Sequence, residues 1–246
     1  MKVTLFATCL VDQFYPEVGM SVVRLLRRLG CEVCFPECQT CCGQPAFNAG
    51  YVEEARRVAR GLLDALEETD YVVSPSGSCV GMIHHYYPEL FAHDRSLAFR
   101  VENLKRRTFE FSQFLVNVLK VTDVGAHFPH RVTYHPSCHG VRFLDIGEEP
   151  FDLLRSVREI DLVPLPHAED CCGFGGTFAV KMSRISEGMV EEKVENIQAT
   201  GARYVTGTDM ACLMNIGGYL KKKSIAIEPL HLAELLDRGL KGEVRA

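Results

Sequence analysis

Eight of the eleven cysteines form two tracts with the same spacing. In each tract an adjacent Cys-Cys pair ends 33 or 34 residues after a lone cysteine, and a last cysteine follows 37 or 40 residues later. Four thiolates can hold a zinc ion or an iron–sulfur cluster. The duplicated spacing therefore predicts two metal sites, with these ligands: Cys9, Cys41, Cys42 and Cys79 in the first, and Cys138, Cys171, Cys172 and Cys212 in the second.

The adjacency of the paired cysteines bears on the kind of metal. Structural zinc usually takes close ligands two to four residues apart, because a short turn wraps one ion. Neighbouring side chains diverge along an extended backbone, which favours a larger object with several metal atoms. Gly43 and Gly173 directly follow the pairs, and a residue without Cβ lets backbone N–H groups approach cluster sulfides. We therefore expect an iron–sulfur cluster in each tract, and zinc at one or both sites remains an alternative.

Three further cysteines, Cys31, Cys34 and Cys38, have no counterpart in the second tract. Unpaired cysteines are often small buried hydrophobes, which is the interpretation we prefer here. Cys38 and Cys41 do form a C-x-x-C motif, so a minor ligand or redox role for Cys38 stays open.

Strand and helix patterns alternate in both halves of the chain. Short β-prone runs at 3–7 and 132–138 each end at a lone cysteine or just before it, and runs at 71–73 and 204–206 lead to the last ones. Helical apolar spacing covers 52–68 and, more weakly, 184–200 (Ile185, Met189, Val190, Val194 and Ile197), and the Cys-Cys-Gly tracts follow short strands at 32–35 and 162–165.

This alternation predicts an α/β fold of two pseudo-symmetric halves, each a small parallel sheet flanked by helices. Ligands of such sheets lie beyond the carboxyl ends of the strands, so we expect the cysteine sites there. The halves are predicted to span 1–93 and 129–246. Residues 94–128, with a helix expected over about 97–119, have no repeat counterpart and are predicted to connect them.

Composition sets limits on the partners. The net charge of −5 gives no basic field that would attract nucleic acid, and we expect none. No apolar run reaches the length of a membrane span. The N-terminal stretch lacks the charged, apolar and small-residue succession of a signal peptide. We therefore expect a cytoplasmic protein, where thiols stay reduced.

The cysteine frame resembles the cysteine-rich CCG domain, which binds [4Fe–4S] clusters in the cysteine-rich component of heterodisulfide reductase and in the iron–sulfur component of glycolate oxidase. Five tracts resemble more closely the lactate utilisation protein A family, namely 39–48, 75–79, 134–140, 171–178 and 208–214. This resemblance covers essentially the whole chain. It implies an iron–sulfur component of a multi-protein system that oxidises L-lactate to pyruvate, with a ferredoxin-like iron–sulfur protein and a third protein as partners.

One departure from the broader CCG domain separates three hypotheses. The cysteine-rich component of heterodisulfide reductase has a fifth thiolate per site, where this chain has Ser76 and Asp209. Four thiolates suit an ordinary [4Fe–4S] cubane and electron transfer in an oxidoreductase complex. A zinc-bearing structural scaffold within that complex is the first alternative. A thiol–disulfide enzyme like the heterodisulfide reductases is the second, and the missing fifth thiolate counts against it.

Other polar residues are secondary candidates. His139 directly follows Cys138 and is our candidate for a catalytic, proton-relaying histidine; a hydrogen-bonded structural role is the alternative for it, as for His84, His85 and His135. Gly43, Gly173, Ser76 and Asp209 are expected to surround the clusters. The Gly173–Gly176 tract lacks the spacing and lysine of a phosphate-binding loop, so we predict no nucleotide or flavin site.

Overall fold

The computed structural model describes residues 1–67 and 69–242. The chain divides into two compact units, Met1–Phe111 and Ser112–Ala246, which are described separately. Residue 68, at the end of the helical pattern 52–68, and residues 243–246, at the end of the predicted second half, lie outside the described residues.

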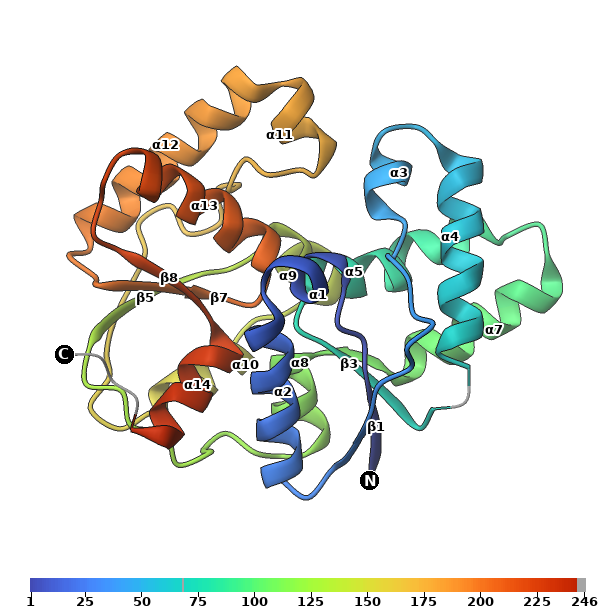
Figure 1. Ribbon diagram of the computed structural model, residues 1–246, viewed down its shortest axis with the longest axis horizontal. Coiled ribbons are helices and arrows are strands. Elements are labelled where there is room, and N and C mark those ends of the chain that lie inside the picture. The colour runs from blue at the N-terminus through green and yellow to red at the C-terminus, as the bar shows by residue number, and fades with distance from the viewer. Residues whose placement is uncertain (68, 243–246) are drawn as a thin grey trace. The chain divides into compact units, whose positions relative to one another are not determined.

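The first unit is built on a four-stranded parallel sheet with strand order β2-β1-β3-β4; Figure 1 labels its two central strands, β1 and β3. Val3 pairs with Val33 on one side of β1, and Thr4 pairs with Val72 on the other. The strand residues are mostly buried, as expected where helices cover both faces of a parallel sheet. The strands are β1 (Lys2–Leu5), β2 (Glu32–Cys34), β3 (Tyr71–Ser74) and β4 (Thr108–Glu110).

Helices make every crossover in this unit, as parallel strands require. The long helix α4 (Val52–Ala65) buries Ala55, Ala59, Leu62 and Leu63 along one face, so the periodicity over 52–68 predicted this helix, which ends at Ala65. The other helices are α1 (Cys9–Phe14), α2 (Pro16–Arg28), α3 (Gln44–Asn48), α5 (Gly77–Gly81), η1 (Met82–Tyr86), α6 (Tyr87–Leu90) and α7 (Arg95–Arg107).

The second unit repeats this plan, with strand order β6-β5-β7-β8. Arg131 pairs with Asp161 and Val132 with Tyr204, the same relative register as in the first sheet. The strands are β5 (Arg131–His135), β6 (Asp161–Val163), β7 (Tyr204–Gly207) and β8 (Glu228–His231). The helices are α8 (Phe111–Gln113) at the boundary, η2 (Phe114–Val118), α9 (Cys138–Leu144), α10 (Glu149–Arg155), α11 (Thr177–Lys181), α12 (Ser183–Ala199), α13 (Met210–Lys222) and α14 (Leu232–Lys241).

The shared strand order positions the cysteines. Strand β2, which follows β1 in the sequence, pairs with one side of β1, and the next strand, β3, pairs with its other side. Loops that depart in opposite directions open a crevice at the carboxyl ends of such strands, where ligands of doubly wound sheets bind. The fold class expected from the sequence is confirmed: two α/β units, each a small parallel sheet flanked by helices.

The helix expected over 97–119 is wrong. Helix α7 ends at Arg107, and Thr108–Glu110 form β4, which pairs with β3. Arg107 holds the helix end, since its guanidinium donates hydrogen bonds to the carbonyl groups of Leu66 and Thr69. Thr108 and Glu110 are fully buried in the sheet. Pairing with β3 therefore outweighs the local helical pattern, which continues past these residues in the sequence.

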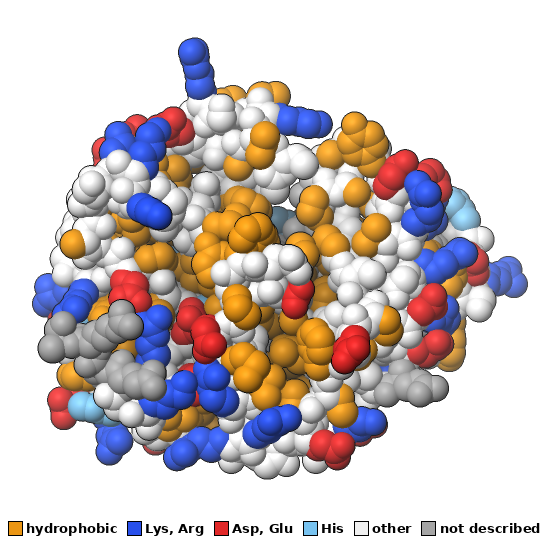
Figure 2. Space-filling model, in the orientation of Figure 1, with side chains coloured by type: hydrophobic (Ala, Val, Ile, Leu, Met, Phe, Trp, Pro, Cys, Tyr) orange, Lys and Arg blue, Asp and Glu red, His pale blue; other side chains and the backbone are white. Residues whose placement is uncertain are grey.

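Charges of both signs are interspersed on the face drawn in Figure 2. Ion pairs at the surface include Arg131 with Asp161 and Arg155 with Glu148, and each such exposed pair contributes little to stability. In the part of the chain that the structure describes, no helix combines the length and the apolar character needed to cross a membrane.

Candidate metal centres

The cysteines of each unit lie in three segments that leave the same edge of its sheet. A lone cysteine begins the helix after the first strand, the Cys-Cys pair lies in the loop after the second, and the last cysteine lies in the helix after the third. Because parallel strands end at one edge, these segments converge. The positions are Cys9 at the start of α1, Cys41-Cys42 after β2 and Cys79 in α5, then Cys138 at the start of α9, Cys171-Cys172 after β6 and Cys212 in α13.

In the first unit all four sulfurs come together. The thiol of Cys9 lies 3.8 Å from the sulfur of Cys41, and that of Cys42 lies 3.5 Å from the sulfur of Cys79. Cys42 also interacts with its neighbour Cys41, which links the two pairs. Cys42 and Cys79 are buried and Cys9 is exposed, so the site has an inner and an outer pair.

The second unit has the same arrangement. The thiol of Cys171 interacts with those of Cys138 and Cys172, and Cys172 interacts in turn with Cys212. Cys172 and Cys212 are buried, whereas Cys138 and Cys171 are half-buried. The structure thus brings together the two sets of four cysteines chosen from spacing alone.

One thiol of each set is prepared to ionise. Hydrogen bonds from the thiols of Cys42 and Cys9 lower the pKa of Cys41 to about 3. Those from Cys138 and Cys172 lower the pKa of Cys171 to about 2. The same hydrogen bonds raise the pKa of the donor thiols, as at Cys9. Cys41 and Cys171 are therefore the thiols most readily ionised, and metal binding would release the protons held by thiols of raised pKa such as Cys9 and Cys138.

The sulfur spacing can be compared with each candidate metal. A tetrahedral zinc ion with Zn–S bonds of about 2.3 Å holds its thiolates about 3.8 Å apart, which matches the 3.8 and 3.5 Å in the first site. A four-iron cluster bonds each cysteine to a different iron, so its thiolates are spread farther apart. The donor set fits both, and a cluster additionally requires the cysteine loops to move outwards.

Glycine is required after each cysteine pair. Gly43 and Gly173 have φ of +87° and +80°, and each backbone N–H donates to a cysteine sulfur, Cys41 and Cys171 respectively, at 3.4 Å. A Cβ on Gly43 would lie 3.1 Å from the carbonyl oxygen of Ala55. One on Gly173 would lie 2.7 Å from that of Ser186, closer than real contacts allow. The glycines therefore direct N–H groups at the sulfurs and let the loops pack on α4 and α12.

Ser76 and Asp209 occupy equivalent helix N-caps. The Ser76 hydroxyl accepts a hydrogen bond from the backbone N–H of Cys79, and an Asp209 carboxylate oxygen accepts one from that of Ala211. Both residues are buried. Both side chains therefore stabilise the start of a helix, α5 or α13, that carries the last cysteine of its site.

Side-chain donors also fix the carbonyl of the inner cysteine of each pair. The Tyr87 hydroxyl donates to the carbonyl of Cys42 at 3.0 Å, and the Asn215 amide donates to that of Cys172 at 2.8 Å. Gln44, considered from the sequence as a donor to sulfide or as a loop-closing residue, donates to the carbonyl of Ser78 at 3.2 Å.

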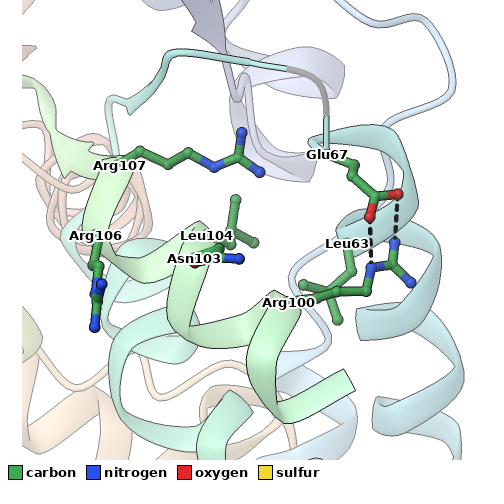
Figure 3. A pocket seen from close by; sticks show the side chains of 7 residues that line it. All are labelled: Leu63, Glu67, Arg100, Asn103, Leu104, Arg106 and Arg107. Carbon is green, nitrogen blue, oxygen red and sulfur yellow. Dashed lines mark hydrogen bonds and ion pairs between the residues drawn. The ribbon is translucent and has the colours of Figure 1, made fainter. Parts of the chain in front are cut away.

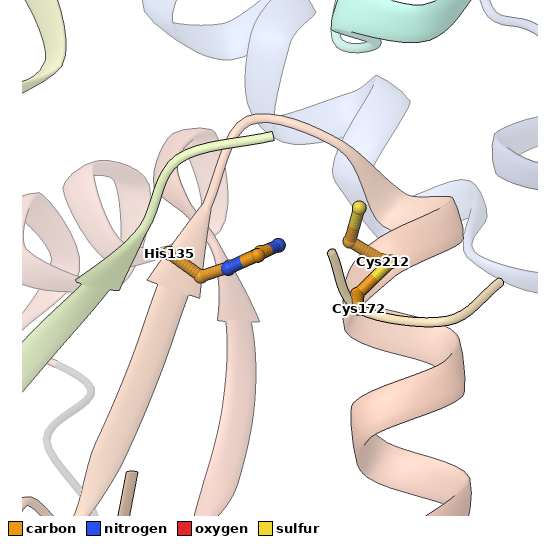
Figure 4. Close-up of side chains that lie close together, drawn as sticks. All are labelled: His135, Cys172 and Cys212. Atoms are coloured by element: carbon orange, nitrogen blue, oxygen red, sulfur yellow. The ribbon is translucent and has the colours of Figure 1, made fainter. Parts of the chain in front are cut away.

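Two histidines lie at the second site. Nδ1 of His139, the candidate catalytic histidine, is 3.5 Å from the sulfur of Cys138, and burial lowers its pKa. His135 lies deeper, at the end of β5. Its ring points toward Cys172 and Cys212 (Figure 4), and burial, followed by the positive charge of Lys193, lowers its pKa to about 3. His135 is therefore neutral.

Lys193 was not found from the sequence. It is buried on α12, and its ammonium group donates to the carbonyls of His167 at 2.7 Å and Ala168 at 3.1 Å, which fixes the loop before Cys171. The available signal was a lysine at helical spacing between Val190 and Ile197, on the face that packs.

A pocket of about 230 Å³ opens beside the first site. Cys9 and Cys41 line it together with the carboxylates of Asp12 and Glu37, so the approach to these sulfurs is negatively charged.

A larger pocket of about 450 Å³ has no cysteine in its lining (Figure 3). Of its three arginines, Arg100 is paired with Glu67 and Arg107 donates to backbone carbonyls, so two of its cations are already engaged within the protein.

Comparison with known proteins decides the family. The model of the cysteine-rich CCG domain matches residues 3–84 and 132–217, one match per unit. Lactate utilization protein A of Geobacillus sp. (strain WCH70) is 53% identical over 96% of this chain and 99% of its own length. The chain belongs to the lactate utilization protein A family. A second member, lactate utilization protein A 2 of Bacillus cereus (strain 03BB102), is 52% identical over 98% of this chain and 99% of its own.

Solved structures are more distant from this family member. Glutamate racemase isoform RacE1 from Bacillus anthracis covers 99% of the chain, with 11% identity and a TM-score of 0.37. The family assignment therefore rests on the sequence relatives and the two CCG matches.

Proposed function

We propose that the chain is the iron–sulfur component of a multi-protein system that oxidises L-lactate to pyruvate, with one cluster, of the [4Fe–4S] type, at each four-cysteine site. The observation that carries this proposal is the convergence of two complete thiol sets in a chain about half identical to proteins named for lactate utilization. Cys41 and Cys171 are the thiols best prepared to bind iron, because neighbouring thiols lower their pKa.

The chemistry needs one-electron carriers. Oxidation of lactate to pyruvate removes two electrons and two protons, and a bound iron–sulfur cluster supplies a carrier for single electrons. The chain's own residues hold the thiolates in place and shield the inner pair from water. N–H groups such as those of Gly43 and Gly173 stabilise charge on the sulfurs, which tunes the potential.

The surroundings of the first site favour relay over substrate binding. Asp12 and Glu37 line the pocket beside Cys9 and Cys41, and two carboxylates repel an anionic substrate such as lactate. We infer that electrons pass through this site to or from a protein, a ferredoxin-like iron–sulfur protein and a third component being the expected partners. We place the system in the cytoplasm, where the thiols stay reduced.

A zinc-bearing scaffold within the complex is the second candidate, and sulfur spacing favours it. The 3.5 and 3.8 Å separations suit a tetrahedral ion without movement of the loops. The thiol–disulfide enzyme is less well supported, because Ser76 and Asp209 stand at the position of the fifth thiolate and serve as helix caps.

Metal analysis of protein purified without oxygen separates these functions. We expect brown protein with roughly eight iron atoms and matching sulfide. Cys42→Ser and Cys172→Ser should each remove about half of the iron. Cys31→Ser, at a buried cysteine that belongs to neither set, is the matched control and should leave it unchanged. Colourless protein containing about two zinc ions would establish the scaffold instead.

A further inference from the structure

The two sites have the same cysteines but differ in one buried neighbour. Three residues before the lone cysteine, where the central strand ends, the first unit has Phe6 and the second has His135. Phe6 is fully buried in the apolar core beside Cys42 and Cys79. His135 is 2% exposed. The same position in the same fold thus carries an apolar ring in one unit and an imidazole in the other.

His135 faces sulfur. A ring nitrogen of His135 and the sulfurs of Cys172 and Cys212 all lie within 4.8 Å of one another, and all three side chains are buried. Figure 4 shows the imidazole extending from β5 toward the two cysteines. Among the described residues, neither ring nitrogen of His135 has a hydrogen-bond partner.

A buried imidazole without a partner needs an explanation, since buried polar groups in native proteins are almost always satisfied. Packing does not supply one, because Phe6 shows that a ring without polar atoms suits this position. Neutral imidazole is the commonest nitrogen ligand of metals in proteins. A metal at the inner cysteines would satisfy the nitrogen that the protein leaves unpaired.

We propose that His135 is a direct metal ligand of the second site, which therefore takes a nitrogen donor together with its thiolates, whereas the first site is all thiolate. The inference rests on the proposed function in requiring bound metal, and it applies to iron and zinc alike. A neutral imidazole ligand adds no negative charge to the site, and histidine ligation raises the potential of an iron–sulfur centre. The two sites would then have different potentials, as a directional electron relay requires.

The test uses the full chain with ¹⁵N in its histidines only. If the protein carries iron, pulsed electron paramagnetic resonance of the reduced protein should detect nitrogen coupling that changes on labelling. His135→Phe, which copies the first unit, should abolish this coupling. His139→Phe, at the other histidine beside the site, should preserve it. If the protein carries zinc, replacement by Co²⁺ should give absorption bands that shift toward an all-thiolate spectrum in His135→Phe alone.

The melting temperature of the metal-free protein gives an independent readout. A purely structural histidine predicts that His135→Phe melts at a lower temperature. A ligand predicts that the metal-free variant melts at the same temperature or higher, because an unsatisfied polar group has been removed, while metal stabilises it less than it stabilises the wild type.

The possible failures are distinguishable. Protein that binds no metal at either site contradicts the proposed function together with this inference. Metal bound at the second site without nitrogen coupling, or with the spectrum unchanged by His135→Phe, overturns the role of His135 alone.

Discussion

The backbone N–H of Gly173 donates a hydrogen bond of 3.4 Å to the sulfur of Cys171 while its α-carbon packs against α12. Both relationships depend on a positive φ and the absence of a side chain. The corresponding residue of the first unit, Gly43, stands in the same relation to Cys41. The two Cys-Cys-Gly loops differ in their flanking sequence, yet both place a glycine N–H against a cysteine sulfur.

Gly173→Ala should destabilise the protein by about 1–3 kcal/mol, because a Cβ meets the carbonyl oxygen of Ser186 at 2.7 Å and φ is +80°. Gly43→Ala should cost less, since its nearest contact is 3.1 Å. Urea denaturation of the metal-free protein measures both. Gly188→Ala is the control: it lies within α12 with open space around it, and should stabilise by up to about 1 kcal/mol.

Thiol alkylation of the metal-free protein should single out Cys41 and Cys171. Their pKa values are lowered to about 3 and about 2 by hydrogen bonds from neighbouring thiols, so both remain thiolates from about pH 7 down to about pH 5. Iodoacetamide should therefore modify them at similar rates at both pH values. Cys31, whose pKa burial raises, should react far more slowly at the lower pH. Rates for Cys41 that fall about tenfold per pH unit would contradict the assignment.

The helix caps give a prediction that separates capping from metal ligation. Asp209→Ala should destabilise α13 by about 1 kcal/mol, and Ser76→Ala should do the same at α5. Asp209→Asn keeps an acceptor oxygen, so denaturation curves and metal spectra should match the wild type. A spectral change in Asp209→Asn would instead mean that the carboxylate binds the metal.

The repeat and the sheets could be predicted because local patterns and tertiary structure agree. Runs rich in β-branched residues became β1, β3, β5 and β7 to within two or three residues of the expected bounds, and each cysteine follows where a parallel sheet places it. The agreement failed at Thr108–Glu110, where three residues pair with β3 inside a helical pattern. Strand pairing joins residues far apart in the sequence, so the periodicity of apolar residues within one segment cannot predict it.

The apolar face of α12 shows a second limit. Ile185 fits the helical pattern of 184–200, yet it is 57% exposed, while Ser186 and Lys193 are buried. Gly173 packs against the carbonyl of Ser186, and the carbonyls of His167 and Ala168 satisfy Lys193. Polar side chains are buried on this face because they bind backbone groups of a neighbouring loop, and the periodicity of the sequence does not show where that loop lies.

The cysteine sets were found because eight residues repeat a spacing, whereas His135 was one of several histidines near them. What distinguishes it is burial without a partner among the described residues, together with the equivalence to Phe6. The equivalence could be seen in the repeat, since both residues stand three positions before a lone cysteine. The burial required the structure.

Lys193→Met should weaken the second site without touching a sulfur. The variant keeps the length and apolar stem of the side chain but loses the hydrogen bonds to the carbonyls of His167 and Ala168. Leaving such buried acceptors unpaired costs about 1–3 kcal/mol, and the loop that leads to Cys171 should open more often. Hydrogen exchange over 164–171 should accelerate, and metal should be lost from the second site first.

The control for this variant is Leu62→Met in the first unit. Leu62 is equivalent to Lys193, because each stands seven residues after the helix residue that its unit's glycine contacts, Ala55 or Ser186. The substitution exchanges one apolar side chain for another. It should leave exchange and metal content near wild type, and equal metal losses in the two variants would show that the change to methionine, and not the lost hydrogen bonds, is the cause.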